Sequence, residues 1–346
     1  MKQANGMTRF VLCEENRYML LAFPELFKGL RVVIAPRHIA RGKFISLFDK
    51  SPPDIVCPSF WELKWATGCV FRCKYCYLQG TLYGNIQPRL KCLNALKDDL
   101  IRFLRWAKNA KLRVLLNTGE LTDSFAMPGW TERLLRILDE VAEIMDNLKV
   151  LFVTKAGSKH IKPLLKHAKT LDYGIISFSI NTHTVASRYE DLAPDPSDRI
   201  KAAKICQDYG FEVRFRLDPM IPIGDWKKEY AELLVYILSK EEVEPTRITI
   251  GTLRGLNKTI RFANDRQWTI FLKQGEKTGW GLKMPREARL LLYETVLGVL
   301  KELGFRGQIA LCKETLSIWR ELASKTLLND PGSYPLWCKV FCNCLP

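Results

Sequence analysis

Three cysteines with close, regular spacing are the residues of this chain whose type and pattern most clearly predict chemistry. Cys69, Cys73 and Cys76 follow the pattern Cys-x3-Cys-x2-Cys, directly after a predicted strand over residues 61–67. Three thiolates in a tight loop can bind three irons of a cubane cluster, which leaves the fourth iron without a protein ligand. An open metal position can bind a substrate or cofactor, as it does in catalytic zinc sites. The pattern therefore predicts a catalytic [4Fe–4S] cluster.

A zinc site or a set of unrelated buried thiols is the alternative interpretation of the same residues. Structural zinc sites usually combine paired Cys-x2-Cys units, and no second pair closes this one. The basic residues Arg72 and Lys74 lie between the cysteines and would offset the charge of bound thiolates. The spacing and its position after a strand favour the cluster.

A second group of cysteines lies near the end of the chain. The chain has 11 cysteines in 346 residues, an odd number. Clustered cysteines in a cytosolic protein indicate metal binding before disulfides. The possible ligands of an auxiliary iron–sulfur cluster are Cys312, which follows a predicted strand over residues 308–311, and Cys338, Cys342 and Cys344. Free thiols on a mobile segment are the alternative.

The elements that must position these cysteines alternate along the chain. Predicted strands cover residues 61–67, 113–117, 149–154, 175–180, 212–217 and 247–252, and predicted helices cover residues 98–109, 131–146, 160–168, 196–209, 226–239 and 285–303. Strand–helix units in series predict a parallel sheet. Right-handed crossovers would curl this sheet into a partial (β/α)6 TIM-like barrel of the α/β class.

Sequence patterns divide the chain into three parts. Residues 1–58 are rich in proline and fit the alternation poorly, which indicates an N-terminal extension. Residues 59–311 form the predicted barrel, and residues 312–346 form a cysteine-rich C-terminal segment. No apolar run approaches the roughly 20 residues that span a bilayer, and the first residues lack a signal-peptide pattern. We therefore expect a cytoplasmic protein with no membrane partner.

The net charge of the chain is strongly positive and unevenly distributed. It amounts to +16, from 53 Lys and Arg against 37 Asp and Glu. Residues 63–97, which contain the cysteine motif, include no acidic residue. A positive field of this kind favours polyanions such as nucleic acids, since phosphate neutralisation releases counterions. A basic surface that only maintains solubility is the alternative.

At the cysteine motif the sequence resembles a known superfamily. Residues 66–82 have the pattern Ala-Thr-Gly-Cys-x3-Cys-x-Tyr-Cys-Tyr-Leu-Gln-x-Thr-Leu. This pattern is similar to that of radical S-adenosylmethionine enzymes, and more closely to the spore photoproduct lyase-like branch. The resemblance continues at residues 152–155 and 178–182, and more loosely at residues 194–222.

The resemblance implies a cofactor chemistry. In that superfamily S-adenosylmethionine chelates the open iron, and the cluster, reduced by an external one-electron donor such as flavodoxin or ferredoxin, cleaves its sulfonium. The 5′-deoxyadenosyl radical that results takes a hydrogen atom from the substrate. The cofactors carry the difficult chemistry, while the protein orients them and excludes water.

The resemblance also implies residues that bind S-adenosylmethionine. Glu120 would hold the methionine amino group, and Thr122 and Asp123 would bind polar groups of the cofactor. Lys155 would meet the methionine carboxylate, while Ser179 and Asn181 would lie near the ribose. A solvated acid in a turn is the alternative for Glu120, and a lysine that only reaches solvent from a strand end is the alternative for Lys155.

Two tyrosines and two arginines complete the set of expected site residues. Tyr75 and Tyr77 flank Cys76, and in the lyases matching tyrosines relay hydrogen atoms during turnover. Ordinary aromatic packing near the cluster is an equal alternative. Arg216 lies in an alternating strand pattern that could direct it to either face, and Arg254 would meet a phosphate or a carboxylate.

One position departs from the lyase pattern. The lyases use a cysteine after their second strand to quench the product radical, and the matching position here is Glu120. A carboxylate is a poor hydrogen-atom donor compared with a thiol. Either another thiol, such as a tail cysteine, replaces it, or the substrate differs.

We expect radical chemistry on a nucleic acid or nucleotide, with the reacting base flipped out of its stack. The alternatives are a radical enzyme that modifies a peptide or small metabolite, a non-catalytic iron–sulfur electron-transfer protein, and a zinc-stapled nucleic-acid-binding module.

Overall fold

The computed structural model describes residues 9–167 and 172–346. Within them, a curled eight-stranded sheet has the order β16-β12-β11-β10-β9-β8-β5-β3. The strands are β3 (Ile45–Phe48), β5 (Phe60–Leu63), β8 (Val114–Asn117), β9 (Leu148–Thr154), β10 (Gly174–Ser179), β11 (Glu212–Met220), β12 (Arg247–Thr252) and β16 (Gln308–Leu311). Neighbours from β5 to β16 pair in parallel, and β3 pairs antiparallel with β5. The predicted partial barrel is confirmed.

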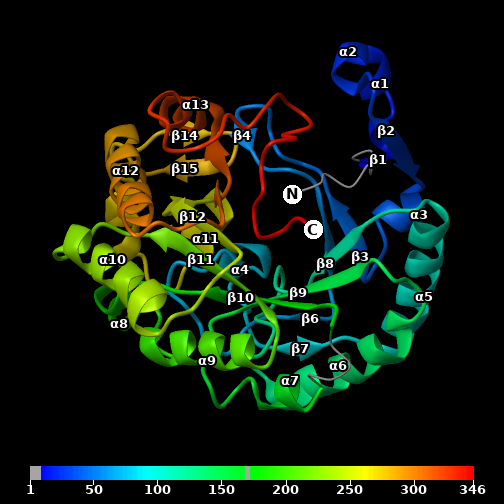
Figure 1. Ribbon diagram of the computed structural model, residues 1–346, viewed down its shortest axis with the longest axis horizontal. Helices are drawn as coiled ribbons and strands as arrows, with labels where there is room; N and C mark the ends of the chain where they lie inside the picture. The colour runs from blue at the N-terminus through cyan, green and yellow to red at the C-terminus, as the bar shows by residue number, and fades with distance from the viewer. Residues whose placement is uncertain (1–8, 168–171) are drawn as a thin grey trace.

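Helices cover the outside of the curled sheet (Figure 1). They include α5 (Leu93–Asn109), α6 (Pro128–Ala142), α7 (Lys162–Lys166), α9 (Pro196–Asp208), α10 (Trp226–Val235), which continues as a π-helix over Tyr236–Lys240, and α12 (Arg286–Glu302). Each corresponds to a predicted helix, although the predicted helix at 160–168 extends beyond the described residues. Helix α9 begins after Asp195, whose side chain accepts a hydrogen bond from the Ser197 backbone, with Pro196 in the first turn.

Short elements join the main ones and were not predicted. They are α4 (Leu78–Thr81), α8 (His183–Tyr189), α11 (Asn257–Phe262), α13 (Leu316–Ser324) and a small sheet of β13 (Arg254–Gly255), β14 (Lys277–Thr278) and β15 (Gly281–Lys283). They lack the length that makes hydrophobic periodicity visible in a sequence. No helix of the described chain is long and apolar enough to cross a membrane.

Segments on both sides of the predicted barrel pair with it or with each other. Strand β3 lies inside the predicted N-terminal extension, so part of that extension belongs to the main sheet. Strand β4 (Ile55–Val56) pairs with β17 (Glu314–Thr315), which lies in the predicted C-terminal segment. The segments before and after the predicted barrel therefore pair with each other through β4 and β17.

The C-terminal segment enters the interior of the curled sheet (Figure 1). Asn343 is fully buried, and its side chain bonds Ser177 and Thr249 at 2.9 and 2.8 Å. Arg214 and Arg247 donate to backbone carbonyls of the tail, at 2.7–3.0 Å. Because buried polar groups are costly to leave unpaired, these contacts hold the tail against the inner face of β10, β11 and β12.

Candidate active site

A cavity of about 440 Å³ lies at the carboxyl ends of the strands. This is the end at which barrels of this type place their functional groups. Its walls come from the cysteine loop, the segment after β8, the ends of β9 to β12 and of β16, and the tail. Aromatic side chains form much of the lining, among them Phe48, Phe60, Phe71 and Trp280.

The cysteine loop presents all three of its thiols to this cavity. Cys69, Cys73 and Cys76 line it and are free thiols. Gly68 precedes them with φ +81°, and a Cβ there would lie 2.4 Å from the backbone oxygen of Gln87, so only glycine fits. This turn directs the loop back over the strand ends, which explains why the motif begins with Gly-Cys.

Burial raises the pKa of each of these thiols. At Cys73 the nearby carboxylate of Glu190 adds to the effect. Within the described residues, no group of three Cys, His, Asp or Glu side chains converges closely enough for a single metal ion. A cubane binds each thiolate through a different iron. The three thiols line one cavity, so each could bind a different iron of a cubane, and the positive irons would stabilise the thiolate forms.

Lys155 reaches the cavity beside this loop, held by a buried carboxylate. Its Nζ lies 3.0 Å from Oε1 of Glu190, and Arg199 lies 2.5 Å from Oε2 of the same side chain. Tyr75 also donates its hydroxyl to Glu190. Burial alone would raise the pKa of Glu190, but Lys155 and Arg199 outweigh burial and lower it to about 2. Glu190 is thus ionised and fixes both Lys155 and Tyr75.

Asp123 ties the segment after β8 to the end of β9. Its carboxylate accepts from the backbone of Lys155 at 2.6 Å and from the hydroxyl of Thr154 at 2.7 Å. It also accepts from the backbone of Phe125 and Ala126, at 2.9 and 3.0 Å. Asp123 therefore positions the backbone from which the Lys155 side chain extends.

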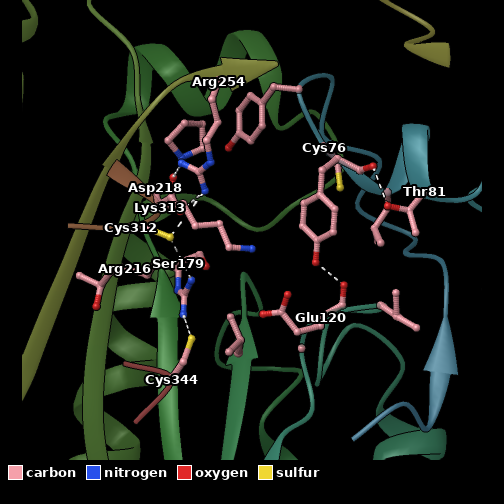
Figure 2. A pocket seen from close by; sticks show the side chains of 18 of the residues that line it. Cys76, Thr81, Glu120, Ser179, Arg216, Asp218, Arg254, Cys312, Lys313 and Cys344 are labelled. Atoms are coloured by element: carbon pink, nitrogen blue, oxygen red, sulfur yellow. Dashed lines mark hydrogen bonds and ion pairs between the residues drawn. The ribbon is translucent and has the colours of Figure 1, made fainter. Parts of the chain in front are cut away.

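Glu120 lies on the floor of the cavity between the two groups of cysteines. Its Oε1 accepts from Nδ2 of Asn117 at 2.9 Å, and its backbone carbonyl accepts from the hydroxyl of Tyr77. Lys313 extends into the cavity nearby (Figure 2). The Lys313 ammonium lies 4.4 Å from the ring centre of Trp280. Burial lowers the pKa of Lys313, but the charges of Glu120 and of neighbouring cysteines outweigh burial, so its pKa is raised.

The wall opposite the cysteine loop combines sulfur with arginine (Figure 2). Arg216 contacts Sγ of Cys344 at 3.3 Å and Sγ of Cys312 at 3.9 Å. Arg254 forms a bidentate pair with Asp218, at 2.8 and 2.9 Å, and lies 3.6 Å from Cys312. Guanidinium groups fixed in this way favour negative charge on the sulfurs they touch.

Cys344 differs in charge state from the other cavity thiols. A hydrogen bond from Cys342 lowers its pKa, burial opposes this, and Arg216 lowers it further, to about 6. The pKa of Cys342 is raised, first by this hydrogen bond and then by burial. Cys338 is exposed and does not line the cavity. Of the four residues predicted for an auxiliary cluster, the structure thus brings three to the cavity and leaves one outside.

Most residues expected from the sequence meet in this cavity. Those that line it are Cys69, Cys73, Cys76, Tyr75, Tyr77, Glu120, Thr122, Lys155, Ser179, Arg216 and Arg254. Asn181 does not line it. The Asn181 amide donates to the Pro219 carbonyl at 2.7 Å and accepts from the Tyr230 hydroxyl at 2.8 Å. Its contacts hold β10 to the end of β11.

Three charged residues of the site were missed by the sequence analysis. Asp218 belongs to the end of β11 and Lys313 follows β16, so both obey the rule that polar residues at the carboxyl ends of strands are functional. The same rule could have identified both residues from the sequence. Glu190 follows the short helix α8, and it carried no recognisable signal because α8 itself was not predicted.

Comparisons with known proteins identify the family of the chain. The family model of spore photoproduct lyase matches residues 46–252. Spore photoproduct lyase of Clostridium acetobutylicum is 27% identical over 175 residues, 50% of each chain. The Bacillus subtilis enzyme is 27% identical over 187 residues, 54% of this chain and 52% of the relative. The chain thus spans about half the length of the curated relatives that it matches.

A solved structure supports the same fold. Spore photoproduct lyase complexed with dinucleoside spore photoproduct is 18% identical, with a TM-score of 0.63, over 89% of this chain and 99% of that chain. At this identity the likeness concerns the fold. The match of the family model, however, covers most of the sheet and the whole cysteine loop. The chain therefore belongs to the spore photoproduct lyase family, a branch of the radical S-adenosylmethionine enzymes.

Proposed function

We propose that this protein repairs a photoproduct in DNA by radical S-adenosylmethionine chemistry. The observation that carries the proposal is the meeting of three cluster-spaced cysteines with Lys155 and Glu120 in one cavity. Structural relatives include a lyase complexed with dinucleoside spore photoproduct. A lesion of that class is the substrate we propose here.

The proposed binding of the cofactors follows from the residues that surround the cavity. Cys69, Cys73 and Cys76 would hold a [4Fe–4S] cluster. The Lys155 ammonium, fixed by Glu190, would bind the methionine carboxylate of S-adenosylmethionine. When bound and reduced by an external one-electron donor such as flavodoxin or ferredoxin, these cofactors supply the chemistry that removes a hydrogen atom from the substrate.

Further residues would orient S-adenosylmethionine and protect the reaction. The negative charge of Glu120 suits the methionine amino group, and the Thr122 and Ser179 side chains offer hydroxyls to its polar parts. Tyr75 is fixed by its hydrogen bond to Glu190, whereas Tyr77 lies along the cavity with its hydroxyl on the Glu120 backbone. The aromatic lining excludes water, which limits side reactions of radicals.

The proposed nucleic-acid substrate is supported by the lining and by the charge of the chain. Aromatic faces such as Trp280 can stack on bases, while the cations Lys313 and Arg254 suit phosphates. The net charge of +16 favours the binding of a polyanion to the surface outside the cavity. A base in the cavity would have to leave the stack of a duplex, as it does in other enzymes that act on bases.

The test is a turnover assay under anaerobic conditions. Reconstituted protein is mixed with dithionite, S-adenosylmethionine and the dinucleoside spore photoproduct, and both 5′-deoxyadenosine and the repaired dinucleoside are measured by mass spectrometry. We expect both products from the native protein and from Cys338→Ala, whose side chain is outside the cavity.

We expect neither product from Cys73→Ala, because one cluster ligand is lost. Formation of 5′-deoxyadenosine with the lesion left intact would refute the proposed substrate. Absence of both products from reconstituted native protein would refute the radical chemistry itself.

A further inference from the structure

Two sulfur atoms of the tail lie in the cavity in which the radical chemistry is proposed. Cys342 and Cys344 both line it. Figure 2 shows Cys344 on the side opposite Cys76. The buried amide of Asn343, between them, fixes this part of the tail to β10 and β12. The position of these sulfurs is therefore built into the fold.

The Cys344 sulfur also lies beside the carboxylate of Glu120. Nδ2 of Asn117 is 2.9 Å from Oε1 of Glu120 and 3.7 Å from Sγ of Cys344. One amide at the end of β8 thus contacts both side chains. A tail sulfur consequently reaches the part of the cavity floor that Glu120 occupies.

The chemistry of a thiol in this place differs from that of its neighbours. An S–H bond is weaker than the C–H, N–H and alcohol O–H bonds of the other side chains that line the cavity. The phenolic O–H bonds of Tyr75 and Tyr77 are comparably weak, but both hydroxyls are engaged, one with Glu190 and one with the backbone of Glu120. A carbon-centred radical formed there would therefore take a hydrogen atom from sulfur most readily. Cys342 and Cys344 are two positions apart, and both line the same cavity, so two thiols are available in one place.

We propose that the Cys342–Cys344 pair is the hydrogen-atom donor that quenches the substrate radical, with Cys344 as the sulfur nearest to it. This assignment rests on the radical function proposed above and names the thiol that completes that reaction. Arg216, at 3.3 Å from Sγ of Cys344, holds the pair in place and balances its negative charge.

The step balances in atoms and electrons. The S–H bond of one cysteine of the pair breaks, a C–H bond forms on the product, and the unpaired electron stays on sulfur as a thiyl radical. One electron from the external reductant that also serves the cluster, and one proton from solvent, restore the thiol. Each product molecule therefore carries one hydrogen from solvent.

The other cysteines of this region are less suited to the role. The sulfur of Cys312 is held between the guanidinium groups of Arg216 and Arg254, at 3.9 and 3.6 Å, and Arg254 is itself paired with Asp218. The thiol of Cys57 is directed at the Pro58 carbonyl, 3.9 Å away. Cys338 lies outside the cavity.

The experiment is turnover of the dinucleoside spore photoproduct in D2O by the full-length reconstituted protein. The native protein is expected to give a product with one deuterium. Cys344→Ala is expected to lower the yield of that product by about tenfold or more, while 5′-deoxyadenosine formation stays within about twofold of native. Cys338→Ala is the matched tail control and should behave like the native protein.

A second variant separates chemistry from folding. Cys344→Ser keeps the size of the side chain but replaces the sulfur by an oxygen, which gives up a hydrogen atom far less readily, so it should show the same loss with an unchanged thermal melt. Native yield and deuterium content in both variants, or the loss appearing in Cys312→Ala instead, would overturn the assignment. A native protein that forms no 5′-deoxyadenosine would contradict the proposed function, which is a distinguishable result.

Discussion

The cysteine loop and Cys344 of the tail carry the same residue type in opposite settings on the two sides of the cavity. On the side of the loop, burial raises the pKa of Cys69, Cys73 and Cys76, and a carboxylate adds to this at Cys73. On the side of the tail, Arg216 contacts the sulfur of Cys344, whose pKa is lowered to about 6.

This difference separates two uses of cysteine. Buried thiols without a neighbouring guanidinium need another positive charge before they become thiolates, and a metal cluster supplies it. The sulfur of Cys344 already contacts the guanidinium of Arg216, and Cys342 also lowers its pKa. Its thiolate form therefore depends less on a bound metal. This contrast fits the two roles proposed above, in which the loop binds the cluster and the tail reacts with substrate.

The largest expected effect concerns iron content. Alanine at Cys69, Cys73 and Cys76 together should abolish the bound iron, because one cluster loses all its protein ligands. Alanine at Cys312, Cys342 and Cys344 together should leave the iron content of the reconstituted protein unchanged. Iron and sulfide analysis of the two triple variants measures this, and a partial loss in the second would indicate an auxiliary cluster in the tail.

The next effect concerns the carboxylate behind the loop. Glu190→Gln leaves Lys155 and Arg199 without their buried counter-charge, which should lower the free energy of unfolding by about 3–5 kcal/mol. Denaturant unfolding at neutral pH measures the loss. Glu140→Gln, at an exposed ion pair with Lys97, is the matched control and should change stability by less than about 1 kcal/mol.

The same carboxylate gives a pH dependence. The pKa of Glu190 falls from 4.5 to about 2 on folding, so the unfolded chain binds the proton more readily. The resulting stabilisation, about 3 kcal/mol, is complete above pH 4.5 and is lost as pH falls toward about 2. The native protein should lose more stability over this interval than Glu190→Gln, and equal losses would contradict this.

A smaller effect is expected where the tail is attached. Asn343→Ala removes a buried amide that bonds Ser177 and Thr249, which should lower the free energy of unfolding by about 1–3 kcal/mol. Hydrogen exchange of the tail should also increase. Asn94→Ala, at an exposed position of α5, is the control, and equal stability of the two variants would argue against a fixed tail.

The smallest effect concerns the charge beside Cys344. Arg216→Gln should raise the pKa of Cys344 from about 6, which reduces the reactive thiolate at pH 7. Iodoacetamide should therefore alkylate Cys344 severalfold more slowly in the variant, as followed by peptide mass spectrometry. Arg216→Lys keeps a positive charge and should retain most of the native rate. An unchanged alkylation rate in Arg216→Gln would show that the guanidinium does not lower the pKa of Cys344.

The barrel and the cysteine loop could be predicted because both leave strong patterns in the sequence. Long helices such as α5 and buried strands such as β10 show hydrophobic periodicity, and the loop has a spacing with few structural alternatives. The inserted tail could not be predicted. Its position depends on buried contacts of Asn343 and Arg214 with residues far away in the chain, and no local pattern encodes such contacts.

The site was predictable in its strand-end residues and not in its partners. Glu120 and Lys155 lie at the expected edge of the sheet, whereas Asn181 follows the same strand as Ser179 but has its side chain bonded to Pro219 and Tyr230. Side-chain direction at a strand end depends on the loop that follows, which the sequence alone did not define. The role of Glu190 depended on the same kind of information.

The most direct test of the central claim is electron paramagnetic resonance of the anaerobically reconstituted, reduced protein with and without S-adenosylmethionine. We expect a reduced [4Fe–4S] signal that changes when S-adenosylmethionine is added, and that is absent from the triple alanine variant of Cys69, Cys73 and Cys76. A signal that stays the same when S-adenosylmethionine is added, or a native protein that binds zinc in place of iron, would contradict the account.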